Sequence, residues 1–292
     1  MAAMLMLALI LSIPVSSSET SESVVHVRGG GAVLLEHVTG VWCDVCADHE
    51  PWVAAMVESN DERLIRVDLH DVIEDPLGNE AATHRRIRLN HTLPFPTYHM
   101  DGHAESTSSV SRGELQMSLL AAESARKTHE VLEATITTNE SGGIVTVAVT
   151  NPIQVEGTQL TLLLLETSVT IPIEEATNGL LVHPAVLQSV MSIEIGGNKT
   201  IKPLAWGGVE MSEGSGLNAI FEFNWPEGVN ADTVTLVVVH EVVEVGNGPA
   251  TLSAISWAVE APSEDVQGAG WVVLLLIGCA FVSLFLRSRS SS

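Results

Sequence analysis

Apolar residues recur at two different spacings in the first half of the chain. Alternation with period two, as at Leu64–Leu69, is typical of strands, whereas spacings of three and four, as in Ala47–Glu58, are typical of helices. An Asp101-Gly102 pair marks a hairpin turn. The pattern predicts strands at Val24–Val27, Val33–Val38, Leu64–Leu69, Pro96–Met100 and His103–Ser106, and helices at Ala47–Glu58, Glu80–Arg88 and Glu114–Arg126.

The second half, from His129 to Val259, is dominated by strand-like apolar runs that are separated by glycine, asparagine and proline turns. About seven short strands in this order favour an immunoglobulin-like β-sandwich. One or two helical turns are expected at Pro184–Met191. The predicted strands are Val131–Thr137, Ile144–Val149, Leu160–Ile171, Ile193–Lys202, Ala219–Trp225, Val234–Val243 and Leu252–Val259.

The two ends of the chain are apolar and differ in length. Residues 1–18 pair a short apolar run with small residues, which is typical of a cleaved signal peptide. Residues 269–286 carry no charge and are followed by Arg287 and Arg289, which predicts a transmembrane helix and a cytoplasmic tail at 287–292. The expected location is therefore the cell membrane, crossed once, with the ectodomain outside the cytoplasm and the tail inside.

Chain length indicates how many domains to expect, and the net charge argues against nucleic-acid binding. At 292 residues with a formal charge of −23, the chain is long enough for two domains and repels nucleic-acid phosphates. The change of pattern near residue 127 predicts one domain at 25–127 and a β-sandwich domain at 128–262. Nucleic acid is therefore not expected among the partners.

Cys43 and Cys46 are the only cysteines outside the terminal apolar runs. They follow a predicted strand and begin a predicted helix, where free N–H groups and the helix dipole stabilise a thiolate. A loop this short gains little from a structural disulfide, so the pair is better suited to thiol–disulfide exchange outside the cytoplasm. Cys43 would attack and Cys46 would resolve, although half of a zinc site has the same spacing.

The residues around this pair resemble the thioredoxin superfamily. Trp42 precedes the first cysteine, Pro51 lies where the family kinks its active-site helix, and Phe95-Pro96-Thr97 is similar to the family's cis-proline loop. Ser111–Leu115 resembles the start of the last helix. The stretch Glu36–Gly40 is most similar to a bacterial outer-membrane family that joins a thioredoxin-like domain to a β-rich one. Asp44-Val45 between the cysteines departs from the Gly-Pro of thioredoxin.

The resemblance implies a fold class and several site residues. The fold would be an α+β thioredoxin-like domain followed by an all-β immunoglobulin-like sandwich and a single C-terminal transmembrane helix. The family's buried proton acceptor would correspond to Glu36 or His37. The expected site consists of the catalytic cysteines Cys43 and Cys46, the client-binding residues Trp42, Pro96 and Thr97, and one of the acceptors Glu36 and His37.

These observations predict a membrane-anchored extracytoplasmic thiol–disulfide oxidoreductase without a cofactor or metal. Its partners would be client proteins with thiols or disulfides, and a separate membrane redox protein. The acids Asp44, Asp48 and Glu50 oppose a thiolate at Cys43, whereas the helix end and a protonated His49 favour one. If the acids dominate, the potential lies nearer that of the reducing family members than the strongly oxidising value of about −120 mV. Two alternatives remain open: a copper or zinc site formed by the cysteines with His49 or His99, and a redox-inert adhesion or client-binding module.

Overall fold

The structure is a computed structural model, and its described residues end at Val259. The predicted signal peptide at 1–18, the predicted span at 269–286 and the tail at 287–292 lie outside the described residues. The described residues are 23–106, 110–126, 130–196, 200–201, 207–211, 217–244 and 250–259.

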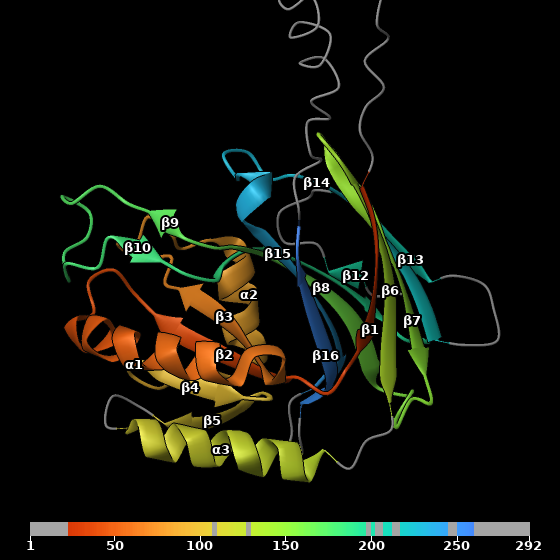
Figure 1. Ribbon diagram of the computed structural model, residues 1–292, viewed down its shortest axis with the longest axis horizontal. Coiled ribbons are helices and arrows are strands. Elements are labelled where there is room, and N and C mark those ends of the chain that lie inside the picture. Colours follow the sequence, from red (N-terminus) through yellow and green to blue (C-terminus); the bar gives the residue numbers. More distant parts are fainter. Residues whose placement is uncertain are drawn as a thin grey trace, which may run out of the picture. The chain divides into compact units, whose positions relative to one another are not determined.

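One nine-stranded sheet runs through both halves of the chain, in the order β16-β15-β8-β11-β3-β2-β4-β5, with β12 paired to β11 (Figure 1). The two halves meet where β3 lies parallel to β11, and the N–H of Asp68 donates to the carbonyl of Ala185 at 2.8 Å. The first half contributes β2 (Val33–Thr39), β3 (Leu64–His70), β4 (Thr97–Met100) and β5 (His103–Ser106). The second half contributes β8 (Thr158–Glu166), β11 (Val186–Glu194), β12 (Thr200–Ile201), β15 (Val234–Val242) and β16 (Thr251–Ala258).

A second, five-stranded sheet has the order β1-β6-β7-β14-β13. Its first strand comes from the start of the described chain and pairs antiparallel with β6, more than a hundred residues later. The sheet comprises β1 (Ser23–Gly29), β6 (Val131–Asn139), β7 (Gly142–Thr150), β14 (Leu217–Asn224) and β13 (Gly207–Met211). A small hairpin, β9 (Val169–Thr170) and β10 (Val182–His183), stands apart from both sheets.

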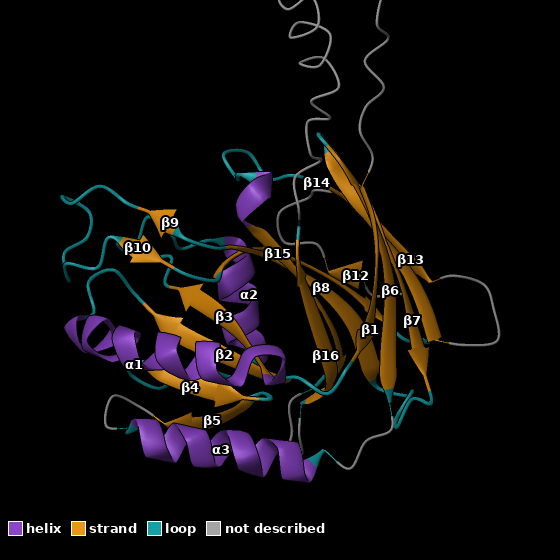
Figure 2. Cartoon of the chain, in the orientation of Figure 1, coloured by secondary structure: helices purple, strands orange, loops and turns teal. Residues whose placement is uncertain are grey.

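Three α-helices lie against the β2–β5 end of the large sheet (Figure 2). α1 (Asp44–Asn60) and α3 (Arg112–Ala125) cover one face, and α2 (Glu80–Arg88) covers the other. α3 begins with a capping box between Ser111 and Glu114, in which each side chain accepts the other residue's backbone N–H. Two 3-10 turns, Asp61–Arg63 and Ala231–Thr233, precede β3 and β15.

Apolar side chains form separate cores on the two faces of β2. Val33 and Leu35 pack with α1 and α3, whereas Leu34 and Val38 face α2 and the β8, β11 and β15 strands. This alternation follows from the period-two geometry of a strand. A third core fills the space between the five-stranded sheet and the far part of the large sheet. By the same alternation, Glu36 shares the face of Leu34 and Val38, whereas His37 shares the face of Val33 and Leu35.

The predicted fold class was wrong. We expected a thioredoxin-like α+β domain followed by a separate immunoglobulin-like sandwich, but strand is the predominant secondary structure of the described part, with sixteen strands and three α-helices. The two halves share one sheet, and β1 belongs to the sheet of the second half. The physical reason is that every residue of β3 is buried, so this strand needs cover on both faces and a neighbour on each edge.

Two further predictions need correction. Pro184–Met191 does not form helical turns, because Val186–Glu194 is strand β11, buried on both faces and therefore without the alternation that identifies a strand. Within the described residues, no helix is long and apolar enough to cross a membrane, so the predicted single-pass membrane location and its transmembrane helix are not supported.

Candidate functional site

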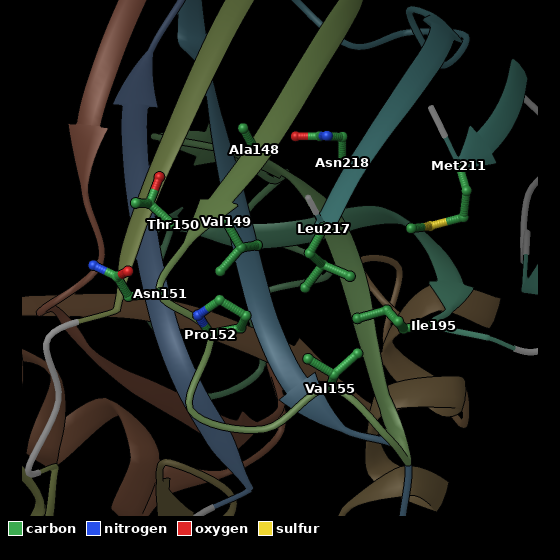
Figure 3. A pocket seen from close by; sticks show the side chains of 10 residues that line it. All are labelled: Ala148, Val149, Thr150, Asn151, Pro152, Val155, Ile195, Met211, Leu217 and Asn218. Atoms are coloured by element: carbon green, nitrogen blue, oxygen red, sulfur yellow. The ribbon is translucent and has the colours of Figure 1, made fainter. Parts of the chain in front are cut away.

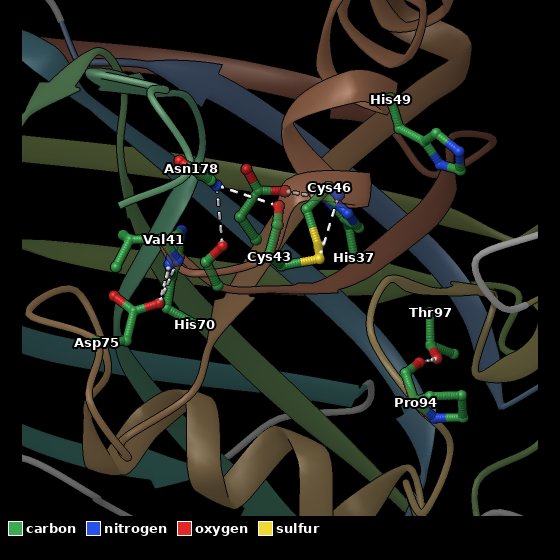
Figure 4. Close-up of a disulfide and its surroundings, with 12 residues drawn as sticks. His37, Val41, Cys43, Cys46, His49, His70, Asp75, Pro94, Thr97 and Asn178 are labelled. Atoms are coloured by element: carbon green, nitrogen blue, oxygen red, sulfur yellow. Dashed lines mark hydrogen bonds and ion pairs between the residues drawn. A yellow bond between two sulfur atoms is a disulfide. The ribbon is translucent and has the colours of Figure 1, made fainter. Parts of the chain in front are cut away.

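A tight turn and a helix start bring the two cysteines together. The N–H of Cys43 donates to the carbonyl of Gly40 at 3.1 Å, and α1 begins at the next residue. Cys43 is the N-cap, and its Sγ accepts the N–H of Cys46 at 3.1 Å. Cys43 and Cys46 form a disulfide, with Cα atoms 5.2 Å apart (Figure 4). The sulfur of Cys43 therefore lies at the positive end of the helix dipole, as the sequence predicted.

The surface beside the disulfide is apolar. Trp42 is 41% exposed and Val45 is 38% exposed, although Cys43 itself is only 6% exposed. The ring of Trp42 contacts that of Phe95, with centroids 4.8 Å apart. An apolar surface of this kind can receive a polypeptide segment beside the sulfurs.

The proline loop lies against the cysteine turn through the contact between Trp42 and Phe95. The Phe95–Pro96 peptide is cis. Thr97 is fully buried, and its hydroxyl donates to the carbonyl of Pro94 at 2.6 Å. The structure thus brings Trp42 and the Pro96 loop together, whereas the hydroxyl of Thr97 is directed into its own loop.

His37 lies on the face of β2 that α1 covers, and Figure 4 draws it beside Cys46. Its Nδ1 is 3.1 Å from Oδ1 of Asp68, and its ring stacks on Tyr98 with centroids 4.7 Å apart. Burial lowers the pKa of His37 more than Asp68 raises it, so the ring is neutral at neutral pH. With Nδ1–H donating to Asp68, Nε2 carries a lone pair and has no hydrogen-bond partner among the described residues.

A buried ion-pair network supports this histidine. The guanidinium of Arg66 binds Asp68 at 2.7 Å and Glu50 at 2.6 Å. Burial alone would raise the pKa of Asp68, but the charge of Arg66 and the hydrogen bond from His37 lower it to about 2. Glu50, which the sequence placed among the acids that oppose a thiolate, is thus paired with Arg66, and only Asp44 and Asp48 remain exposed near the disulfide.

Tyr98 connects His37 to the helix that carries the cysteines. Its hydroxyl lies 3.0 Å from Nδ1 of His49. Burial raises the pKa of Tyr98, so the phenol stays protonated and donates to His49. Burial lowers the pKa of His49, and the nearby His37 lowers it further. His49 is therefore neutral at neutral pH and adds no positive charge beside the sulfurs.

Glu36, the other predicted proton acceptor, points to the opposite face of β2. Its carboxylate binds the guanidinium of Arg85 at 2.7 Å, and Arg85 also binds Glu241 at 2.8 Å. All three side chains are fully buried. Glu36 is therefore separated from the disulfide by the sheet and belongs to an ion-pair network that joins α2 to β15.

The second half of the chain contributes residues that the sequence did not indicate. The β9–β10 loop reaches the cysteine turn, and Asn178 donates its side-chain amide to the carbonyls of Gly40 and Cys43, each at 3.2 Å. From the β3–α2 loop, Asp75 accepts the N–H of Val41 at 3.1 Å. No local motif identifies Asn178, since an asparagine between glycine and threonine is typical of any turn.

The predicted alternative of a metal site gains no support from the geometry. His49 is hydrogen-bonded to Tyr98, and His99 faces α2 with Glu36, on the side of the sheet away from the disulfide. In the part of the chain that the structure describes, no three His, Cys, Asp or Glu side chains are grouped so that they could hold a metal ion.

A cavity of about 770 Å³ lies at the ends of β7 and β14, away from the cysteines (Figure 3). Its described lining holds no titratable side chain and includes Val149, Pro152, Met211 and Leu217. The described lining is mainly apolar and includes the polar side chains of Thr150, Asn151 and Asn218.

Comparison with known proteins shows a likeness of fold. No family model and no curated protein matches the sequence. The structure of HBP35 of Porphyromonas gingivalis superposes with a TM-score of 0.61 at 15% identity, covering 80% of this chain and 78% of that one. The crystal structure of a protein from Agrobacterium tumefaciens gives a TM-score of 0.49 at 10% identity, covering 78% and 94% of the two chains. The resemblance to the thioredoxin superfamily stays a prediction, and what is shown is that this chain is similar in fold to HBP35.

Proposed function

We propose that the protein is a thiol–disulfide oxidoreductase that exchanges disulfides with client polypeptides through Cys43 and Cys46. The observation that carries this proposal is the position of Cys43, whose sulfur caps α1 and accepts the N–H of Cys46. A helix N-terminus stabilises a thiolate, which is the nucleophile in exchange. The short spacing of the pair and the apolar Trp42 beside it support the same function.

The proposed reaction transfers two electrons. The Cys43 thiolate attacks a client disulfide, forms a mixed disulfide and releases one client thiolate. The thiolate of Cys46 then attacks Sγ of Cys43, which forms the intramolecular disulfide and releases the second client thiolate. The client disulfide is reduced while the cysteine pair is oxidised, and the reverse sequence oxidises a client dithiol.

His37 is the residue that we assign to proton transfer in the second step. Before it attacks, the Cys46 thiol must lose its proton, and the lone pair on Nε2 of the neutral His37 can accept it. Asp68 fixes the tautomer by accepting from Nδ1. Glu36 has no such role in this proposal, because its charge is paired with Arg85 on the other face.

A redox titration tests the function. The protein is equilibrated in buffers of graded reduced-to-oxidised glutathione ratio, quenched, alkylated and analysed by mass. A reversible two-electron transition confined to Cys43 and Cys46 supports the proposal, and its midpoint tells whether the pair donates or accepts electrons.

Two cysteine variants complete this test. Cys46→Ser should accumulate a mixed disulfide between Cys43 and a client peptide, whereas Cys43→Ser should form none. Absence of any transition in the wild type, or cysteines that stay masked until a chelator is added, would overturn the proposal.

A further inference from the structure

The loop between β9 and β10 belongs to the second half of the chain, yet it lies directly on the turn that carries Cys43 (Figure 4). The backbone N–H of Asn178 donates to the carbonyl of Val41 at 2.9 Å. Its side-chain amide donates to the carbonyls of Gly40 and Cys43, and the hydroxyl of Thr177 donates to Val41 at 3.2 Å. Four hydrogen bonds from two adjacent residues therefore hold one four-residue turn.

The orientation of the Asn178 amide is fixed by a second contact. Its Oδ1 accepts the N–H of Leu180 at 3.0 Å, and a backbone N–H can donate only to the oxygen of the amide. The amide nitrogen must then face the turn, where both of its hydrogens find a carbonyl. Apolar contacts of Ile171 and Ala176 with Val41 hold the loop in place.

The two carbonyls that Asn178 binds define the geometry of Cys43. The carbonyl of Gly40 also accepts the N–H of Cys43, and the carbonyl of Cys43 accepts the N–H of Ala47 at 3.2 Å, which is the first hydrogen bond of α1. Holding both carbonyls keeps Cys43 at the N-cap, where its sulfur accepts the N–H of Cys46.

The hydrogen bonds from Asn178 to the cysteine turn stabilise the two redox forms to different extents. In the disulfide form, the covalent bond to Cys46 also fixes Cys43. In the dithiol form that bond is gone, and only hydrogen bonds and packing keep the sulfur of Cys43 at the helix end, where its thiolate is stabilised. Asn178 therefore contributes more to the reduced form than to the oxidised form.

We propose that Asn178 is a positioning residue of the redox pair, which stabilises the dithiol form by holding Cys43 at the N-cap of α1. This inference rests on the proposed thiol–disulfide exchange. The redox site would then contain residues from both halves of the chain, because the residue that holds the attacking cysteine lies in the β9–β10 loop.

The test compares Asn178→Ala with Asn139→Ala. Asn139 is a matched control, since its side chain also accepts backbone N–H groups within a turn, from Ser141 and Gly142, but in the β6–β7 hairpin. The equilibrium measured is that of the protein disulfide with two glutathione thiols, which gives the protein dithiol and one glutathione disulfide.

We expect Asn178→Ala to lower the equilibrium constant for reduction about fivefold, the effect of losing a hydrogen bond that favours one form. That change moves the midpoint potential by about 20 mV in the reducing direction. Alkylation of Cys43 at pH 7 should slow by a similar factor, because the thiol pKa rises. Asn139→Ala should change neither quantity.

The melting temperatures of the reduced and oxidised proteins distinguish a positioning role from a purely structural one, because a purely structural residue would affect both equally. Asn178→Ala should lower the melting temperature of the reduced protein more than that of the oxidised protein, whereas Asn139→Ala should lower both equally. The milder variant Asn178→Ser, whose hydroxyl cannot reach both carbonyls, serves if the alanine variant does not fold. If the wild type shows a redox transition and the Asn178 variants have the same midpoint potential, this inference is overturned and the proposed function stands. If the wild type shows no transition, the proposed function is overturned.

Discussion

Nδ1 of His37 lies 3.1 Å from Oδ1 of Asp68, beneath the first turns of the helix that carries the disulfide. The carboxylate holds the imidazole in the tautomer that leaves Nε2 free to accept a proton. The neighbouring residue Glu36 lies on the other face of the same strand. The sequence predicts either Glu36 or His37 as the proton acceptor, but their positions on opposite faces give them different expected roles.

Replacing His37 should affect resolution of the mixed disulfide. We expect His37→Leu to slow attack by Cys46 about a hundredfold at pH 6–7, since general-base assistance is lost. The deficit should shrink at higher pH, where Cys46 ionises without help. Stopped-flow kinetics over a pH series measures this, and equal slowing at all pH values would contradict the role.

The control for this prediction is Glu36→Gln. It changes the charge of the adjacent residue, but on the face of β2 away from the cysteines. Its exchange rate should stay within about twofold of the wild type, while its stability falls because Arg85 loses one of its two carboxylate partners.

Arg85 should be essential for stability. Its guanidinium is fully buried between Glu36 and Glu241. Burial would raise the pKa of Glu241, but Arg85 and Arg88 lower it to about 2, so the carboxylate is charged. Arg85→Met leaves two buried carboxylates without their common partner and should reduce the free energy of unfolding by about 3–5 kcal/mol. Urea unfolding measures this, and a loss below about 1 kcal/mol would show that Arg88 compensates.

Replacing Trp42 should reduce the rate of exchange with client peptides more than it reduces the stability of the protein. The residue is 41% exposed, and its ring contacts that of Phe95. We expect Trp42→Ala to cost about 1 kcal/mol of stability or less, while slowing exchange with a disulfide peptide about tenfold. Exchange with a small disulfide such as oxidised glutathione should be unchanged. If both substrates slow equally, Trp42 acts on the cysteines and not on the client.

Stability should fall as the pH drops below about 6.5, the ordinary pKa of histidine. Burial lowers the pKa of His37, His99 and His183, and lowers that of His91 to about 4. The unfolded chain therefore binds more protons than the folded protein in this range, which favours unfolding as the pH falls. Melting temperatures between pH 7 and pH 4 should decrease, and His91→Gln should flatten part of that decrease. A curve that is flat across this window would contradict the assignment.

Local patterns were sufficient for the elements around the disulfide. The helix that follows the cysteines, the helix Glu80–Arg88 and the hairpin at Asp101-Gly102 all occur as predicted. Each depends on residues close in sequence: Cys43 and Asn79 as N-caps, and a positive φ of 84° at Gly102.

Long-range pairings could not be read from the sequence. The pairing of β3 with β11 involves one residue pair, Asp68 with Val186, and the almost completely buried β11 lacks the alternation that marks a strand. For the same reason Asn178 was missed, because its partners lie about 135 residues away in the chain. The sequence therefore predicted the cysteines and their helix but not the residues that hold them from the second half.

The shared sheet has a consequence for how the protein is made. The core on the α2 side of β2 includes Leu163, Leu187 and Val237, which leave the ribosome long after Cys43 and Cys46. Until they do, strand β3 has no neighbour on its β11 edge, and α2 alone packs on its apolar face in this core. The attacking cysteine is thus synthesised early but reaches its final environment late, so a nascent chain presents both thiols to its surroundings before the site that controls their reactivity exists.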